Sequence, residues 1–214
     1  KAMGMYLQAT EPALKAVRNA VKVSFVNLTS PRHKVIVEPL GIGALVGDLR
    51  REFGNEVKIS TVDAQFGLSA PQILDELRRV QPEIIALSAQ LESHEVLTEL
   101  LDLLQHEPWV NEHGARVLVG GNLPTNEHRI FLEKYPFVLI VRGEGEIAMR
   151  EAVRWVQGDL TIDDIPGASF FRGGKIVETD GTPVPAGELG LPSRDSLLTM
   201  LDHEADVQIE TSRG

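Results

Sequence analysis

Residues 83–88 have the sequence EIIALS, in which four apolar side chains stand in a row. A strand that faces water on one side alternates apolar and polar residues, whereas a strand buried on both faces is apolar throughout. Residues 137–141, with the sequence FVLIV, have the same character. Both segments therefore predict central strands of a parallel sheet that is covered on its two faces.

Outward from these segments, short apolar runs alternate with amphipathic stretches. Strands are expected at residues 21–28, 57–62, 83–88, 116–119 and 138–141. Apolar side chains that recur at three- and four-residue spacings predict helices at residues 40–53, 70–80, 93–106, 127–134 and 146–157. Right-handed crossovers place such helices on both faces of the sheet. The sequence predicts a doubly wound α/β domain with a five-stranded parallel sheet, either Rossmann-like or flavodoxin-like.

The rest of the 214 residues is expected to flank this domain. Residues 1–20 are predicted to be a tail or short helix, whose first residues can be vector-derived, and residues 21–158 form the α/β domain. Residues 159–206 are predicted to hold a small β-hairpin, turned at Gly173-Gly174, and a Pro/Gly-rich linker. Residues 207–214 have strand character, and we expect them to begin a further domain.

The composition argues against several classes of function. The formal net charge of −10 at pH 7 repels phosphate backbones, so nucleic acid is not an expected partner. The absence of cysteine excludes disulfides, thiolate-bound zinc, cysteine nucleophiles and iron–sulfur ligands within these residues. No apolar run approaches the roughly 20 residues that a membrane span needs. We therefore expect a cytoplasmic protein that binds neither nucleic acid nor membrane.

Unusual residues follow four of the expected strands, at the edge where doubly wound sheets bind ligands. Glycines there let a ligand approach the backbone closely, and the backbone amides can then donate hydrogen bonds to the ligand. One such loop would be an ordinary turn, but four that converge on one edge indicate a binding site. The candidate binding residues are Thr29, Ser30, Pro31, Arg32, His33, Glu38, Leu40, Gly41, Ser88, Gln90, Leu91, Gly120, Gly121, Asn122, Pro124, Thr125, Gly143, Glu144, Gly145 and Glu146.

The familiar nucleotide motifs do not occur at this edge. No G-x-G-x-x-G follows the first strand, and the phosphate-loop pattern G-x-x-x-x-G-K-[ST] occurs nowhere in the chain. A phospho-receiver domain would need paired acids after the first strand and an aspartate after the third, where this chain has Asn27-Leu28 and Ser88. A flavin or another nucleotide-like ligand remains an alternative.

Several motifs occur here in the order and spacing of one known family. They are Glu38-Pro39-Leu40-Gly41-Ile42, Val119-Gly120-Gly121 with Pro124-Thr125, Val141-Arg142-Gly143-Glu144-Gly145-Glu146, Ile165-Pro166-Gly167, Phe171-Arg172-Gly173-Gly174-Lys175-Ile176-Val177 and Leu191-Pro192-Ser193-Arg194-Asp195. Together they resemble the N-terminal cobalamin-binding domain of B12-dependent radical S-adenosylmethionine enzymes, from about Val21 onwards.

The resemblance implies that the candidate residues bind cobalamin. It also implies that Glu210-Thr211-Ser212-Arg213-Gly214 leads into a C-x-x-x-C-x-x-C loop that binds a [4Fe-4S] cluster. That loop would belong to a barrel domain, absent here, which also holds S-adenosylmethionine and a small-molecule or peptide substrate. We expect this radical domain to be the partner of the present one, and we expect no catalytic residue within these 214 residues.

One position departs from cobalamin domains of the methionine-synthase type. Those domains carry D-x-H-x-x-G after the first strand, and the histidine coordinates cobalt. Here His33 lacks both the preceding aspartate and the following glycine, because Pro31 and Ile36 occupy those places. We therefore expect base-off cobalamin without a histidine ligand, with Arg32 or His33 covering the lower face, or with His33 simply exposed on its loop.

Two classes of function are consistent with these expectations. In the first, the parent protein is a methyltransferase in which cobalamin relays a methyl group from S-adenosylmethionine to an unactivated carbon. Ring-forming and rearranging enzymes share the same layout. In the second, the chain is a stand-alone cobalamin carrier or sensor that docks to a partner.

Overall fold

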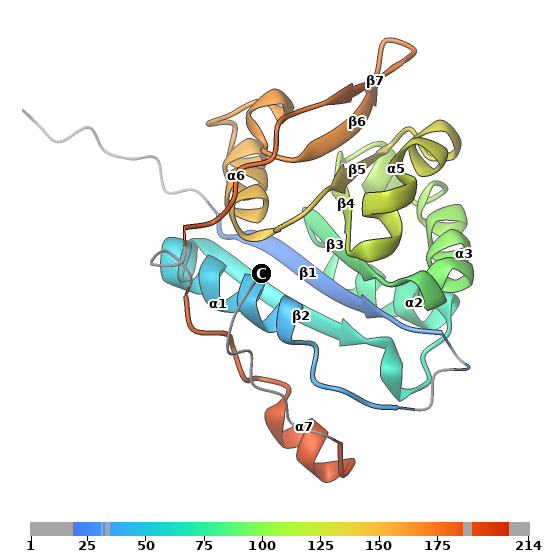
Figure 1. The fold of residues 1–214 in the computed structure, drawn as a ribbon, viewed down its shortest axis with the longest axis vertical. Helices are drawn as coiled ribbons and strands as arrows, with labels where there is room; N and C mark the ends of the chain where they lie inside the picture. Colours follow the sequence, from blue (N-terminus) through green and yellow to red (C-terminus); the bar gives the residue numbers. More distant parts are fainter. Residues whose placement is uncertain (1–18, 31, 33–34, 186–189, 206–214) are drawn as a thin grey trace, which may run out of the picture.

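The computed structural model describes residues 19–30, 32, 35–185 and 190–205, and a seven-stranded sheet forms its centre (Figure 1). The five expected strands are β1 (Val21–Leu28), β2 (Val57–Asp63), β3 (Ile84–Ala89), β4 (Arg116–Gly120) and β5 (Val138–Val141). They pair in parallel in the order β2-β1-β3-β4-β5. The doubly wound prediction is confirmed, and this strand order is the flavodoxin-like one.

The predicted hairpin extends the main sheet instead of standing apart from it. β6 (Ala168–Arg172) pairs antiparallel with β5, and β7 (Lys175–Glu178) pairs antiparallel with β6. Gly173 and Gly174 turn the chain with φ angles of 58° and 79°. Positive φ at both central residues is what a two-residue hairpin turn requires, which explains the glycine pair.

Helices cover both faces of the sheet (Figure 1). On one face α1 (Leu40–Phe53) and α6 (Glu146–Gln157) bury their apolar sides. On the other face lie α2 (Ala70–Val80), α3 (His94–Leu104) and α5 (Asn122–Lys134). The sequence did not predict α4 (Pro108–Asn111) and α7 (Leu197–Asp202), because each is too short to show a helical period. The strand expected at residues 207–214 lies outside the described residues.

The start of α5 differs from its prediction. The helix begins at Asn122, five residues before the expected start, and a non-helical residue, Glu127, with φ −117° and ψ 20°, interrupts it. The apolar period expected from residue 127 belongs to the part after this kink. Pro124 lies in the first turn, where the missing amide hydrogen leaves no helical bond unmade.

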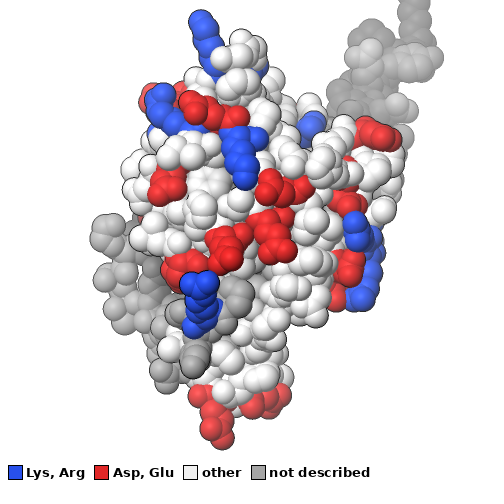
Figure 2. All heavy atoms as spheres, turned by 90° about the vertical axis from the view of Figure 1, so that its right-hand side faces the viewer, with Lys and Arg blue, Asp and Glu red and all other residues white. Residues whose placement is uncertain are grey.

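The surface of one face is mainly acidic. Figure 2 shows the side on which α3 lies, and acidic side chains gather across its middle. Glu95 and Glu99 of α3 are among the exposed carboxylates. Such a surface repels a phosphate backbone. Within the described ranges, none of the helices combines the length and the apolar character needed to cross a bilayer.

A buried ion pair joins α1 to α6. The Asp48 side chain of α1 is 1% exposed, and its two carboxylate oxygens accept hydrogen bonds of 2.6 Å each from Arg150 Nε and Nη2 of α6. Arg51 Nη2 donates to the same carboxylate at 2.8 Å. A carboxylate this deeply buried is stable only when such partners offset its lost hydration. The pair therefore fixes how α1 and α6 lie against each other.

Replacing Asp48 by alanine should lower the free energy of unfolding by about 3–5 kcal/mol, because Arg150, 11% exposed, loses its carboxylate partner. Urea denaturation measures this change. The matched control is Arg172→Ala, which breaks an ion pair to Asp163 whose side chains are 54% and 46% exposed and should cost about 0–1 kcal/mol. Equal losses in the two variants would contradict the structural role of Asp48.

Candidate ligand-binding site

A cavity of about 660 Å³ opens at the carboxyl ends of the parallel strands. Residues of β1, β3, β4 and β5 form its sheet side, and residues of α1 and α6 face them. Phe25 of β1 and Ser88 of β3 both line it, so the cavity lies over the two strands between which the strand order reverses, where doubly wound folds bind ligands. The volume lies within the roughly 300–1,000 Å³ typical of small-molecule sites.

The interior of the cavity is apolar. Phe25, Ala86 and Leu118 are direct neighbours across β1, β3 and β4, so their side chains point to the same face of the sheet. Leu45 of α1 and Met149 of α6 face them from the helices. Because Ala86 is small and lies between two larger neighbours, the floor is recessed at its centre. The interior is therefore a slot suited to a flat apolar group.

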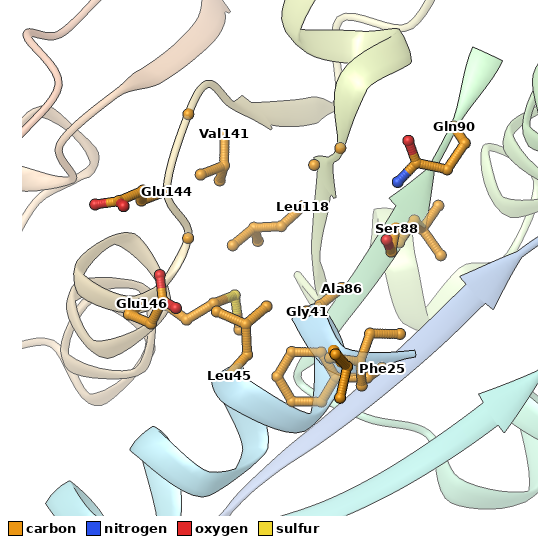
Figure 3. Close-up of a pocket in the computed structure, with 18 residues that line it drawn as sticks. Phe25, Gly41, Leu45, Ala86, Ser88, Gln90, Leu118, Val141, Glu144 and Glu146 are labelled. Carbon is orange, nitrogen blue, oxygen red and sulfur yellow. The ribbon is translucent and has the colours of Figure 1, made fainter. Parts of the chain in front are cut away.

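Polar side chains lie at two opposite sides of this slot (Figure 3). Ser88 and Gln90 follow β3 on one side, and Glu144 and Glu146 precede or begin α6 on the other. Glu146 is 4% exposed, and its position in the first turn of α6 places the carboxylate at the positive end of the helix dipole. Glu144 Oε2 accepts a hydrogen bond of 2.7 Å from the amide of Val184, so this carboxylate also anchors the segment after β7.

Glycines shape the mouth of the cavity for two different reasons. A Cβ atom on Gly121 would lie 2.3 Å from the carbonyl oxygen of Ala89, and φ is +105° there. Only glycine allows this close crossing of the ends of β3 and β4. Gly143 also has a positive φ, of +81°, but a Cβ there would meet nothing within 4 Å. Gly143 is therefore explained by its backbone conformation and not by a close approach.

The structure brings about half of the candidate residues together. Those that line the cavity are Leu40, Gly41, Ser88, Gln90, Gly120, Gly121, Gly143, Glu144, Gly145 and Glu146. Described candidates that do not line it are Thr29, Ser30, Arg32, Glu38, Leu91, Asn122, Pro124 and Thr125. Pro31 and His33 lie outside the described residues.

Five of the candidates outside the cavity have other places in the structure. Asn122, Pro124 and Thr125 form the first turn of α5 instead of a loop. Leu91 is 64% exposed and does not line the cavity. Glu38 forms an ion pair with Arg194 of the linker.

The residues that sequence reasoning missed are all apolar. They are Phe25, Ile42, Leu45, Ala86, Leu87, Leu118, Val141 and Met149. Their sequence signal is that of ordinary core positions in strands and helices, and only the packing of α1 and α6 over the sheet brings them to one cavity. No histidine lines the cavity in the part of the chain that the structure describes, nor does that part hold a group of three or more His, Asp or Glu able to bind a metal ion.

A flavodoxin-like sheet with an apolar slot under two helices and a glycine-lined mouth defines a doubly wound ligand-binding domain. The range that includes every cavity residue except Phe25 also matches a known family. The chain belongs to the B12 binding domain family, whose profile matches residues 32–153.

Curated relatives are longer proteins. The 4'-phospho-dehydrooxetanocin synthase of Priestia megaterium is 29% identical over 177 residues, which are 82% of this chain and 24% of that protein. An anaerobic magnesium-protoporphyrin IX monomethyl ester cyclase of Cereibacter sphaeroides is 33% identical over 54% of this chain and 19% of its own length. An uncharacterized methyltransferase of Pyrococcus horikoshii is 27% identical over 98% of this chain and 42% of its own length.

Solved structures show the same relation. The cobalamin-dependent S-adenosylmethionine radical enzyme OxsB, with aqua-cobalamin and S-adenosylmethionine bound, superposes with a TM-score of 0.83 at 29% identity, over 91% of this chain and 27% of that chain. The radical S-adenosylmethionine methyltransferase TsrM of Kitasatospora setae shares the fold, with a TM-score of 0.58 at 17% identity over 81% of this chain and 31% of its own. The chain therefore matches a region of B12-dependent radical S-adenosylmethionine enzymes, and the resemblance found in the sequence is confirmed.

Gly121→Ala should lower the free energy of unfolding by at least about 1 kcal/mol, because it forces a strained φ as well as the close approach to Ala89. Gly120→Ala is the matched control. Its Cβ would lie 3.8 Å from the nearest atom, the carbonyl oxygen of Val141, so stability should stay within about 0.5 kcal/mol of the native value. Thermal or urea unfolding compares the two, and similar stabilities would show that the crossing at Gly121 is relaxed.

Proposed function

We propose that this chain is the cobalamin-holding part of a B12-dependent radical S-adenosylmethionine enzyme. The observation that carries the proposal is the apolar slot of about 660 Å³ beneath the strand ends, within a chain that belongs to the B12 binding domain family. Cobalamin combines a broad macrocycle with a nucleotide tail. The open mouth suits the macrocycle, and the slot between sheet and helices suits the base of the tail.

Each part of the cavity has a distinct role in this proposal. Phe25, Ala86 and Leu118 offer apolar contact to a flat base, and burying such a group is favourable because it removes apolar surface from water. Ser88 and Gln90 offer hydrogen-bonding groups for corrin amides or for the phosphate and ribose of the tail. When bound, cobalamin supplies a cobalt centre able to accept and donate a methyl group.

We propose that cobalamin binds base-off, which means that its own nucleotide base does not coordinate cobalt. We also propose that no histidine of the protein coordinates cobalt. Two observations support this. No histidine of the described residues lines the cavity, and His33, outside them, lacks the D-x-H-x-x-G surroundings of ligating histidines. The residues that line the cavity would then hold the cofactor without supplying a histidine to cobalt.

The reaction of the whole protein is proposed to be methyl transfer to an unactivated carbon, within a longer protein that holds a [4Fe-4S] cluster, S-adenosylmethionine and a small-molecule or peptide substrate. The match to a methyltransferase over 98% of this chain supports it. A synthase and a cyclase among the relatives favour a ring-forming or rearranging reaction as the second candidate. In either case the chain described here binds the cofactor, and the chemistry on the substrate belongs to another domain.

The proposal predicts that the protein retains hydroxocobalamin through a desalting column, and that the visible spectrum of the bound cofactor is unchanged in a His33→Ala variant. Flavin mononucleotide, tested in parallel, should not be retained. A colourless protein fraction would refute cobalamin binding. A spectrum that changes in His33→Ala would instead show that His33 coordinates cobalt, and would leave the binding function intact.

A further inference from the structure

Helix α1 presents two different faces to two different parts of the molecule. Gly41 and Leu45 lie on the face that lines the cofactor cavity. Gly43, Gly47 and Arg50 follow one another at spacings of four and three residues, which places them together on the opposite face. Whatever packs against this second face can move or hold the wall of the cavity.

The linker lies directly on this second face. A Cβ atom on Gly43 would lie 2.7 Å from the carbonyl oxygen of Ser193, and one on Gly47 would lie 2.2 Å from that of Leu191. The amide of Ser193 donates a hydrogen bond of 2.8 Å to the carbonyl oxygen of Gly43. Figure 1 shows the described part of the linker passing along α1 on its way to α7. The two glycines thus form a groove in which the linker backbone touches the helix backbone.

Charged side chains fix the linker at one end of the groove. Arg50 donates to both carboxylate oxygens of Asp195, at 3.0 Å and 2.6 Å, and to Ser193 Oγ at 3.1 Å. This bidentate contact with Arg50 holds the pKa of Asp195 below its usual value. Such paired geometry gives directional as well as electrostatic specificity.

A second charged contact lies at the start of α1. Arg194 pairs with Glu38, whose side chain is 2% exposed. The other carboxylate oxygen of Glu38, Oε1, is buried and has no hydrogen-bond partner among the described residues. A carboxylate in this state depends on its cation, because an uncompensated buried charge is strongly unfavourable. The pair connects two motifs that lie 156 residues apart.

Glu38 is separated from the cavity wall by one residue. Pro39 follows it, and Leu40 and Gly41 then line the cavity. The carbonyl oxygen of Pro39 accepts the first helical bond of α1, from the amide of Gly43 at 3.0 Å. A shift of Glu38 therefore moves the first turn of α1, which faces the ligand on one side and the linker on the other.

We propose that residues 191–195 form a clasp that couples the linker to the cofactor cavity. Seated in the Gly43–Gly47 groove and paired through Arg194 to Glu38, the clasp holds the α1 wall in the shape that binds cofactor. Release of the clasp weakens cofactor binding, and by thermodynamic reciprocity bound cofactor holds the clasp closed by the same factor. The inference rests on the proposed cobalamin binding, and it makes Arg194 a positioning residue with no contact to the cofactor.

The first test is the affinity for hydroxocobalamin, measured by titration of the visible spectrum. Arg194→Ala should weaken binding at least about fivefold, the lower end of typical coupling between sites, and Arg194→Lys should restore part of the loss because it keeps the charge. The matched control is Arg172→Ala, which breaks the ion pair between Arg172 of β6 and Asp163, away from α1. This control should bind as the native protein does.

The second test needs no variant, and it decides the matter if Arg194→Ala does not fold. Hydrogen exchange of the Ser193 amide reports clasp opening, because that amide donates to Gly43. Hydroxocobalamin should slow this exchange, whereas the Thr179 amide, which donates to Ala168 at 2.9 Å in the hairpin, should be unaffected.

The outcomes separate the clasp from the function on which it rests. Native affinity in Arg194→Ala, or an unchanged Ser193 exchange rate on saturation with hydroxocobalamin, would overturn the clasp while cobalamin binding stands. A native protein that binds no hydroxocobalamin would overturn the proposed function, and the coupling with it.

Discussion

The buried contact between Asp48 and Arg150 joins α1 to α6, the two helices that cover the slot, and the site depends on how these helices lie. Apolar side chains alone would let the two helices slide together over the sheet and fill the space that Phe25, Ala86 and Leu118 leave open. A bidentate ion pair has a defined length and direction, so it holds the helices at one separation. The contact therefore helps to fix the two helices over the slot.

The fold could be predicted from the sequence, but only about half of the residues that line the cavity could. Strands such as residues 83–88 contain an unbroken apolar run, and that signal is local, so the five parallel strands and their order along the chain could be predicted. The placement of β6 beside β5 and the register of Phe25, Ala86 and Leu118 are long-range features, for which no short stretch carries a signal. The glycines at the mouth could be predicted because a glycine directly after a strand is itself a sequence signal for an unusual backbone conformation. The apolar slot was missed because its residues look like core.

The ion pair between Glu38 and Arg194 is another long-range feature that no local sequence signal predicts. Each belongs to a motif visible in the sequence. Glu38 precedes a predicted helix and is a candidate binding residue, whereas Arg194 belongs to the predicted linker. Their contact joins residues 156 positions apart, so no local pattern in the sequence could predict it.

The relatives differ in their named reactions, a synthase, a cyclase and a methyltransferase, and the present chain spans only 19–42% of their length. What the described residues can specify is how a cofactor is held.

We propose that the slot between the sheet, α1 and α6 receives the nucleotide tail of cobalamin. The most direct measurement compares the dissociation constants of hydroxocobalamin and of cobinamide, which keeps the macrocycle and cobalt but lacks the tail base. Burial of that base in the apolar slot predicts that cobinamide binds at least about tenfold more weakly, a difference of about 1.4 kcal/mol. Equal dissociation constants for the two ligands would show that the tail does not occupy the slot.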